Sequence, residues 1–143
     1  MKIHIVGSSS FAKQMYEYQD KLRALGHEFT LHADYVAQAK GEASEMLERI
    51  HTEHTKLKKE NNYIMYHYNE ILNNEAILVL NFDKNGISNY IGGNTLMEIG
   101  FAFVNHKKIF LLNPIPEEVS YVEEIKAMVE PENILNDDLN KII

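Results

Sequence analysis

The sequence contains no cysteine, and this absence excludes several classes of chemistry. Disulfide bonds, thiolate nucleophiles and cysteine-based zinc sites all require a residue that the chain lacks. Cationic residues are also few, with 14 lysines and arginines against 21 acidic residues and a formal net charge of -7. Because a nucleic-acid polymer is bound through clustered cations, we predict no such partner. A small ligand that carries a phosphate stays compatible with this composition, since backbone groups can hold it.

Long apolar runs are absent as well. No segment approaches the roughly 20 apolar residues of a membrane-spanning helix, so we predict no membrane partner. The N-terminal "MKIHIVGSSS" lacks the longer apolar core of a signal peptide, so we expect a cytoplasmic protein. The 143 residues contain no internal repeat and no low-complexity linker, and they predict a single domain over residues 1–143.

The first part of the chain alternates between strand and helix patterns. "KIHIVG" predicts a short buried strand that Gly7 ends, and "HEFTLH" predicts a second strand. Between them, apolar residues recur every three or four positions and predict an amphipathic helix that ends at Gly26; they are Phe11, Met15, Tyr18, Leu22 and Leu25. Residues 34–60 are polar and rich in helix formers. We interpret them as a helical insertion, partly exposed, that lies over a site or against a partner subunit.

The alternation continues to the end of the chain. The apolar run from Ala76 to Phe82, interrupted only by Asn81, predicts a strand buried on both faces of a parallel sheet. "YIMYHYNEILNN" before it predicts a helix, another helix begins near Asn94, and "KKIFLLNP" predicts the next strand. "EEVSYVEEIKAM" predicts a helix, "ENIL" a fifth strand and "DDLNKII" a terminal helical turn. This order predicts an α/β fold: a doubly wound, mostly parallel five-stranded sheet, Rossmann-like or flavodoxin-like, with helices on both faces.

One acidic residue, Glu98, stands in a helix that is otherwise almost wholly apolar, within "YIGGNTLMEIGFAF". "TLME" fits a capping box, in which Thr95 caps the helix and Glu98 reaches back to a backbone N–H. Alternatively, Glu98 belongs to a ligand site, because Gly92 and Gly93 let a ligand approach the backbone and the helix dipole keeps the carboxylate ionised. Ligands of such sheets bind beyond the carboxyl ends of the strands, where this loop lies, and we favour the site.

Three other motifs carry candidate residues. In "GSSSF", Gly7, Ser8 and Ser9 can offer N–H and hydroxyl groups to a phosphate, although helix capping explains this motif better when it is taken alone. Asp83 lies in the turn-forming "DKNG" at a strand end, which makes it a candidate for ligand contact. "HTEH", residues 51–54, has no third metal ligand nearby, so we interpret it as a solvated helix face and predict no metal site.

The segment from "AILVLN" through "GGNTLMEIGFAFVNHKKIFLL" resembles the core of the nucleoside 2-deoxyribosyltransferase family, which includes deoxynucleoside 5'-monophosphate N-glycosidases. The family motif reads roughly G-x-x-x-E-x-G-x-A, and the resemblance places Glu98 at the position of the nucleophile. "IVGSSSF" is similar to the first strand and loop, which in the glycosidase branch holds a 5'-phosphate. The resemblance also implies a homodimer or higher homo-oligomer, because the family completes its pockets with residues of a neighbouring subunit.

Two acidic positions of the family are absent from this chain. The transferases have an aspartate six residues before the nucleophile, where Gly92 stands here. They have another aspartate in the helix before the central strand, where this chain reads "YHYNE". Asp83, His67 or Asn69 are the candidates to replace these carboxylates.

Together, these residues lead to one hypothesis with two alternatives. The hypothesis is cleavage or transfer at the N-glycosidic bond of a nucleoside or nucleotide, without a cofactor, through a glycosyl group bound covalently to Glu98. Asp83 or His67 would protonate the leaving base. The predicted substrate-binding residues are Gly7, Ser8, Ser9, Asn69, Gly92, Gly93, Asn94, Thr95 and Asn113. The alternatives are an enzyme like the nucleotide phosphoribohydrolases, whose "GGxGTxxE" loop is similar to "GGNTLME", and a non-catalytic nucleotide sensor.

Overall fold

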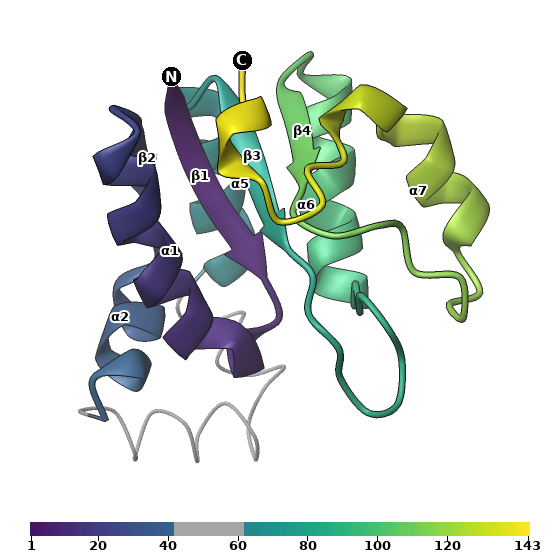
Figure 1. Ribbon diagram of the computed structural model, residues 1–143, viewed down its shortest axis with the longest axis horizontal. Coiled ribbons are helices and arrows are strands. Elements are labelled where there is room, and N and C mark those ends of the chain that lie inside the picture. The colour runs from purple at the N-terminus through teal and green to yellow at the C-terminus, as the bar shows by residue number, and fades with distance from the viewer. Residues whose placement is uncertain (42–61) are drawn as a thin grey trace.

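In the part of the chain that the structure describes, a four-stranded, all-parallel sheet forms the centre, with the strand order β2-β1-β3-β4 (Figure 1). The computed structural model describes residues 1–41 and 62–143. The strands are β1 (Lys2–Gly7), β2 (Glu28–Thr30), β3 (Ala76–Leu80) and β4 (Lys108–Leu111). Every residue of β3 is buried, as its continuous apolar run predicts. The predicted α/β class with a parallel sheet is therefore confirmed.

Helices cover both faces of the sheet (Figure 1). The longer ones are α1 (Ala12–Ala24), α2 (Ala33–Ala39), α5 (Tyr63–Asn73), α6 (Gly93–Val104) and α7 (Val122–Met128). The described residues also form three short 3₁₀ helices, η1 (Ser9–Phe11), η2 (Pro131–Asn133) and η3 (Leu139–Lys141). Of the predicted insertion at 34–60, α2 contains the first residues, while residues 42–60, including "HTEH", lie outside the described residues.

The alternation of side chains along β1 divides the apolar core into two layers. Ile3 and Ile5 pack with α1 and the C-terminal segment, whereas Val6 packs with α5, α6 and α7. His4 points to the same face as Val6, because side chains two residues apart share one face of a strand. The parallel register places His4 beside Thr30 of β2 and Ile77 of β3.

The prediction of a fifth strand at "ENIL" is wrong. Its first residues belong to η2, and Ile134 makes only an isolated parallel bridge to Leu111. The chain makes two hydrogen bonds along this edge, from Leu135 N to Leu111 O (2.8 Å) and from Asp137 N to Leu112 O (2.8 Å). It is not extended there, because Asn136 and Asp137 adopt positive φ angles of 51° and 60°, which no strand contains. The segment is therefore an edge contact and not a fifth strand.

A pair of asparagines ties the carboxyl ends of β3 and β4 together. Asn81 is fully buried, and its side-chain amide donates to the carbonyls of Asn113 (3.0 Å) and Pro114 (3.1 Å). In return, Asn113 N donates to Asn81 Oδ1 (2.9 Å) and Asn113 Nδ2 donates to Asn81 O (3.1 Å). These bonds satisfy backbone groups at the sheet edge that would otherwise be buried without partners.

We expect Asn81→Leu to lower the free energy of unfolding by about 2 to 4 kcal/mol, since it leaves several buried donors and acceptors unsatisfied. Denaturant unfolding measures this change. Asn105→Ala is the matched control: it removes one amide bond to a backbone carbonyl (Asn105 Nδ2 to Phe101 O, 2.8 Å) at a half-buried site, with an expected cost below about 1 kcal/mol. Equal losses in the two variants would contradict the role given to Asn81.

Candidate active site

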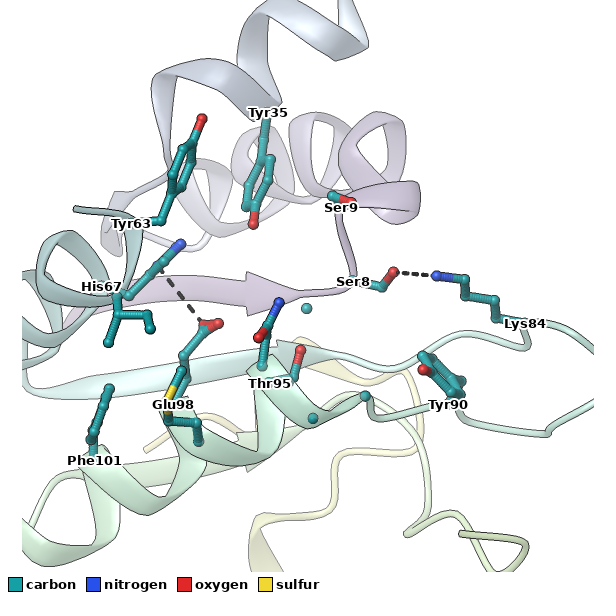
Figure 2. A pocket seen from close by; sticks show the side chains of 16 residues that line it. Ser8, Ser9, Tyr35, Tyr63, His67, Lys84, Tyr90, Thr95, Glu98 and Phe101 are labelled. Atoms are coloured by element: carbon teal, nitrogen blue, oxygen red, sulfur yellow. Dashed lines mark hydrogen bonds and ion pairs between the residues drawn. The ribbon is translucent and has the colours of Figure 1, made fainter. Parts of the chain in front are cut away.

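A cavity of about 220 Å³ opens at the carboxyl ends of β1 and β3, where the predicted loops converge (Figure 2). Side chains and backbone from the β1–η1 loop, α2, α5, the β3–α6 loop and α6 line it. They are Gly7, Ser8, Ser9, Tyr35, Tyr63, Ile64, His67, Lys84, Tyr90, Gly92, Gly93, Asn94, Thr95, Met97, Glu98 and Phe101. The first of these must be glycine, because a Cβ atom on Gly7 (φ +153°) would lie 2.8 Å from Leu80 O.

Glu98 lies in the second turn of α6 and lines this cavity, with 5% of its surface exposed. The helix begins at Gly93 and its N-cap is Gly92, so Thr95 lies inside the helix. The capping box that "TLME" suggested is therefore absent. The carboxylate instead faces His67 of α5, whose Nδ1 lies 3.8 Å from Glu98 Oε2 (Figure 2).

His67 is an uncharged imidazole at neutral pH. Its pKa is lowered from 6.5 to about 3, mainly by burial and in addition by the neighbouring His4 and His32. Its contact with Glu98 is thus not an ion pair at pH 7. A neutral ring can assist a leaving base only through its single N–H group.

His4 is a buried polar residue that the sequence analysis did not single out. It is fully buried in β1, where its Nδ1 lies 2.7 Å from Thr30 Oγ1 and its Nε2 lies 2.9 Å from His67 Nδ1. Burial lowers the pKa of His4 to about 4. One signal for it existed in the sequence: a histidine between the apolar residues of "KIHIVG" requires a hydrogen-bond partner inside the fold.

One end of the cavity is suited to an anion. Lys84 Nζ donates to Ser8 Oγ (2.9 Å) and lies 5.2 Å from the centre of the Tyr90 ring (Figure 2). The N-terminus of α6, at Gly93 and Asn94, borders the same region and carries the positive end of the helix dipole. Among the residues that the structure describes, Lys84 is the one lysine or arginine in the lining. The sequence did not predict a role for Lys84, because "DKNG" is typical of a turn and indicates nothing further.

The other end of the cavity is aromatic and apolar. Tyr63, Ile64 and Phe101 line it, and the ring of His32 stacks on Tyr63 with centroids 4.7 Å apart at an interplanar angle of 17°. Tyr35 of α2 also lines the cavity, and its pKa is raised by burial and then by the charge of Glu98, so its hydroxyl stays protonated at neutral pH. No motif in the sequence distinguished these tyrosines from ordinary helix residues.

Nine of the twelve predicted site residues line the cavity: Gly7, Ser8, Ser9, His67, Gly92, Gly93, Asn94, Thr95 and Glu98. The structure does not bring the other three there. Asp83 is exposed and its Oδ1 accepts from Asn89 N (2.9 Å), so it shapes the turn. Asn69 is exposed on α5, and the side-chain amide of Asn113 donates to Asn81. Neither Asp83 nor Asn69 therefore replaces a family carboxylate within this cavity.

Residues 1–41 and 62–143 lack both a metal-binding cluster and a membrane-spanning helix. These residues contain no group of three or more histidine, aspartate or glutamate side chains that could hold a metal ion. No helix in the same ranges is both long and apolar enough to cross a membrane.

No protein-family model and no curated protein matches this chain. Three chains of solved structures do match. One is the CMP N-glycosidase BcmB of Clostridium botulinum, at 13% sequence identity and a TM-score of 0.48, with 90% of this chain and 83% of that chain covered. Similarity at this level does not place the chain in a family.

The two buried histidines make stability depend on pH in a predictable direction. In the unfolded chain they protonate near pH 6.5, whereas in the folded protein their pKa values are about 4 and about 3. The unfolded state therefore binds more protons between pH 6.5 and about 4, and the free energy of unfolding falls as the pH falls through this window. Each histidine contributes a loss of at most about 1.4 kcal/mol per pH unit there.

Denaturant unfolding between pH 7 and pH 4.5 measures this slope. His4→Leu removes one of the two contributions, so the variant loses less stability on acidification than the wild type. Asn105→Ala, which removes a half-buried side chain that does not titrate, serves as control and keeps the wild-type slope. A wild-type stability that does not change between pH 6.5 and pH 5 would contradict burial of neutral histidines.

Proposed function

We propose that this protein is an enzyme that cleaves the N-glycosidic bond of a nucleoside 5'-monophosphate, with Glu98 as the nucleophile. The observation that carries the proposal is the position of a buried carboxylate between two chemically different ends of one cavity. Ser8, Lys84 and the N-terminus of α6 form the end suited to a phosphate, and Tyr63 and Phe101 belong to the end suited to a nucleobase. A sugar that joins the two lies beside Glu98.

The chemistry follows retaining glycoside hydrolysis. An oxygen of Glu98 attacks the anomeric carbon, the bond from that carbon to the base nitrogen breaks, and the base leaves with the bonding electrons. Neutral His67 and the protonated hydroxyl of Tyr35 are hydrogen-bond donors for the leaving base, and water supplies the proton that the base finally takes. Water then cleaves the glycosyl ester in a hydrolase, whereas a second base accepts the sugar in a transferase.

Lys84 supports a phosphorylated substrate over a neutral nucleoside. A lysine that projects into a cavity next to a serine hydroxyl and a helix N-terminus provides charge-assisted hydrogen bonds to an anion. The resemblance of "IVGSSSF" to a phosphate-holding loop points to the same end of the cavity. The homo-oligomeric state that this resemblance implies stays a prediction, as does the cytoplasmic location.

Glu98→Gln keeps the shape of the side chain and removes its negative charge. We expect it to lower the rate of base release by a factor of at least about 1,000, because the amide is not a nucleophile. Chromatography of free base, after incubation with ribo- and 2'-deoxynucleosides and their 5'-monophosphates, measures this rate. Nucleotide binding by wild type and variant alike, without base release by either, would overturn the enzyme and favour a sensor.

Lys84→Met tests the phosphate end separately. We expect KM for 5'-monophosphates to rise by about 10- to 100-fold, in line with one lost charge-assisted bond, while the weaker activity on nucleosides changes little. Lys126→Met, at an exposed lysine of α7, is the matched control and leaves both unchanged. An equal loss on nucleosides and 5'-monophosphates would show that Lys84 does not bind the phosphate.

A further inference from the structure

Tyr90 lines the cavity at the end that carries Lys84, and its ring occupies a defined position there (Figure 2). A Cβ atom on Gly92 would lie 2.9 Å from Tyr90 Oη and 3.2 Å from Tyr90 Cε1. The backbone of Gly92 is extended (φ -86°, ψ 177°), a conformation that any residue adopts. The ring of Tyr90, and not the backbone, is therefore what requires glycine at position 92.

The hydroxyl edge of the Tyr90 ring thus lies against the N-cap of α6, because Gly92 is that N-cap. A glycine has no side chain that can bond the N–H groups of the first helical turn, as serine or aspartate would. The positive end of the helix dipole and the Tyr90 hydroxyl therefore border the same space.

Lys84 contacts the same ring. Its Nζ lies 5.2 Å from the centre of the Tyr90 ring and 2.9 Å from Ser8 Oγ. Among the lining residues that the structure describes, Glu98 is the one carboxylate, and it lies in the second turn of α6. A hydroxyl, an ammonium group and a helix N-terminus therefore meet at an end of the cavity where the described lining offers an anion no acidic neighbour.

The loop between β3 and α6 holds both side chains in place through its own backbone. Tyr90 N donates to Phe82 O (2.9 Å), which closes the loop. Lys84 N donates to Ile87 O (3.0 Å), and Ile87 N donates to Lys84 O (2.9 Å). Because these bonds fix the backbone on both sides of the loop, an anion that binds here orders little additional chain, which lowers the entropic cost of binding.

The hydroxyl of Tyr90 has a hydrogen to donate to a ligand. Within residues 1–41 and 62–143, no acceptor is bonded to it, whereas the hydroxyls of Tyr18 and Tyr121 donate to Asp137 and to Ile91 O. A hydroxyl that donates to an anionic oxygen makes a charge-assisted hydrogen bond, which is stronger than a bond between neutral groups.

We propose that Tyr90 is a substrate-binding residue that selects nucleoside 5'-monophosphates: its hydroxyl donates a hydrogen bond to a phosphate oxygen, beside Lys84 and the N-terminus of α6. The proposal rests on the proposed function and adds a neutral donor to its one cation. A lysine attracts an anion from any direction, whereas a hydroxyl held against Gly92 bonds an oxygen at one position. Together they determine both the charge and the place of the group that the cavity accepts.

Calorimetric titration with inorganic phosphate and with ribose 5-phosphate tests the contact without reference to catalysis, since neither probe carries a base. Tyr90→Phe keeps the ring against Gly92 and removes only the hydroxyl, so we expect both Kd values to rise by about 10-fold. Tyr16→Phe is the matched control and leaves both values unchanged. Tyr16 is also half-buried with a lysine over its ring (Lys40 Nζ at 5.7 Å), but it does not line the cavity.

Gly92→Ala tests the position of the ring. The added Cβ atom must displace the Tyr90 ring, so we expect the affinity for both probes to fall at least as far as in Tyr90→Phe. Gly100→Ala is the control in the same helix and leaves both Kd values unchanged, because a Cβ atom there meets no described atom within 4 Å outside the helix backbone. Wild-type affinity in Gly92→Ala would overturn the position given to the hydroxyl.

Turnover gives a second measurement. Tyr90→Phe should raise KM for 5'-monophosphates by the same factor of about 10 and change kcat less than about twofold, because the phosphate bond is made equally in the ground state and the transition state. Its activity on nucleosides should equal that of the wild type. An equal loss on nucleosides would contradict a bond to the phosphate.

The remaining outcomes separate this role from the proposed function. Unchanged Kd values in Tyr90→Phe would overturn the role of Tyr90 even in an active enzyme. A weaker affinity for ribose 5-phosphate alone would do the same, because the hydroxyl would then bond the sugar, and so would base release by a wild type that binds neither probe. Binding of both probes, weakened in Tyr90→Phe, by a protein that releases no base would instead reject the proposed function and leave Tyr90 as an anion-binding residue.

Discussion

The Glu98 carboxylate is buried, and the groups around it must compensate for its removal from water. Removing a carboxylate from water costs several kcal/mol unless nearby groups stabilise its charge. Its place one turn inside α6 lets the helix dipole offset part of this cost. The neighbouring ring, His67, is neutral, so it does not neutralise the carboxylate at physiological pH. The proposed function requires Glu98 to keep its charge, because an anionic carboxylate with little access to water is most reactive toward carbon.

The parallel sheet explains why these groups meet. Because β1 and β3 are adjacent and run in the same direction, the loops that follow them leave the sheet side by side. The first loop supplies Ser8 and the second supplies Lys84, and the two side chains bond across the mouth of the cavity. The second loop continues into α6, which carries Glu98. The amides of Asn81 and Asn113 hold the ends of β3 and β4 beneath it. A rigid sheet edge thus positions a site that is built largely from loops and helix ends.

The parts of the fold and site that the sequence predicts well are those encoded by local pattern. A continuous apolar run marks β3, and a single carboxylate in an apolar helix marks Glu98. The fifth strand was wrong because the asparagine and aspartate after "ENIL" adopt positive φ, which sequence pattern does not distinguish from an ordinary strand end. Lys84 and His4 were not predicted for another reason. Each makes its hydrogen bond to a residue more than 60 positions away in the sequence, Ser8 and His67 respectively, and no local pattern indicates such a contact. Asp83 was a candidate because it lies at a strand end. Its carboxylate instead accepts a hydrogen bond from Asn89 N within the same loop.

The most direct test of the account is mass spectrometry of the protein after rapid acid quenching during turnover of a nucleoside 5'-monophosphate. The account predicts a mass increase equal to one sugar phosphate, located on the peptide that contains Glu98. An enzyme that releases free base while this peptide stays unmodified at every quench time, even with a slowly hydrolysed 2-fluoro sugar, would contradict it. That result would favour direct attack by water, as in the phosphoribohydrolase-like alternative.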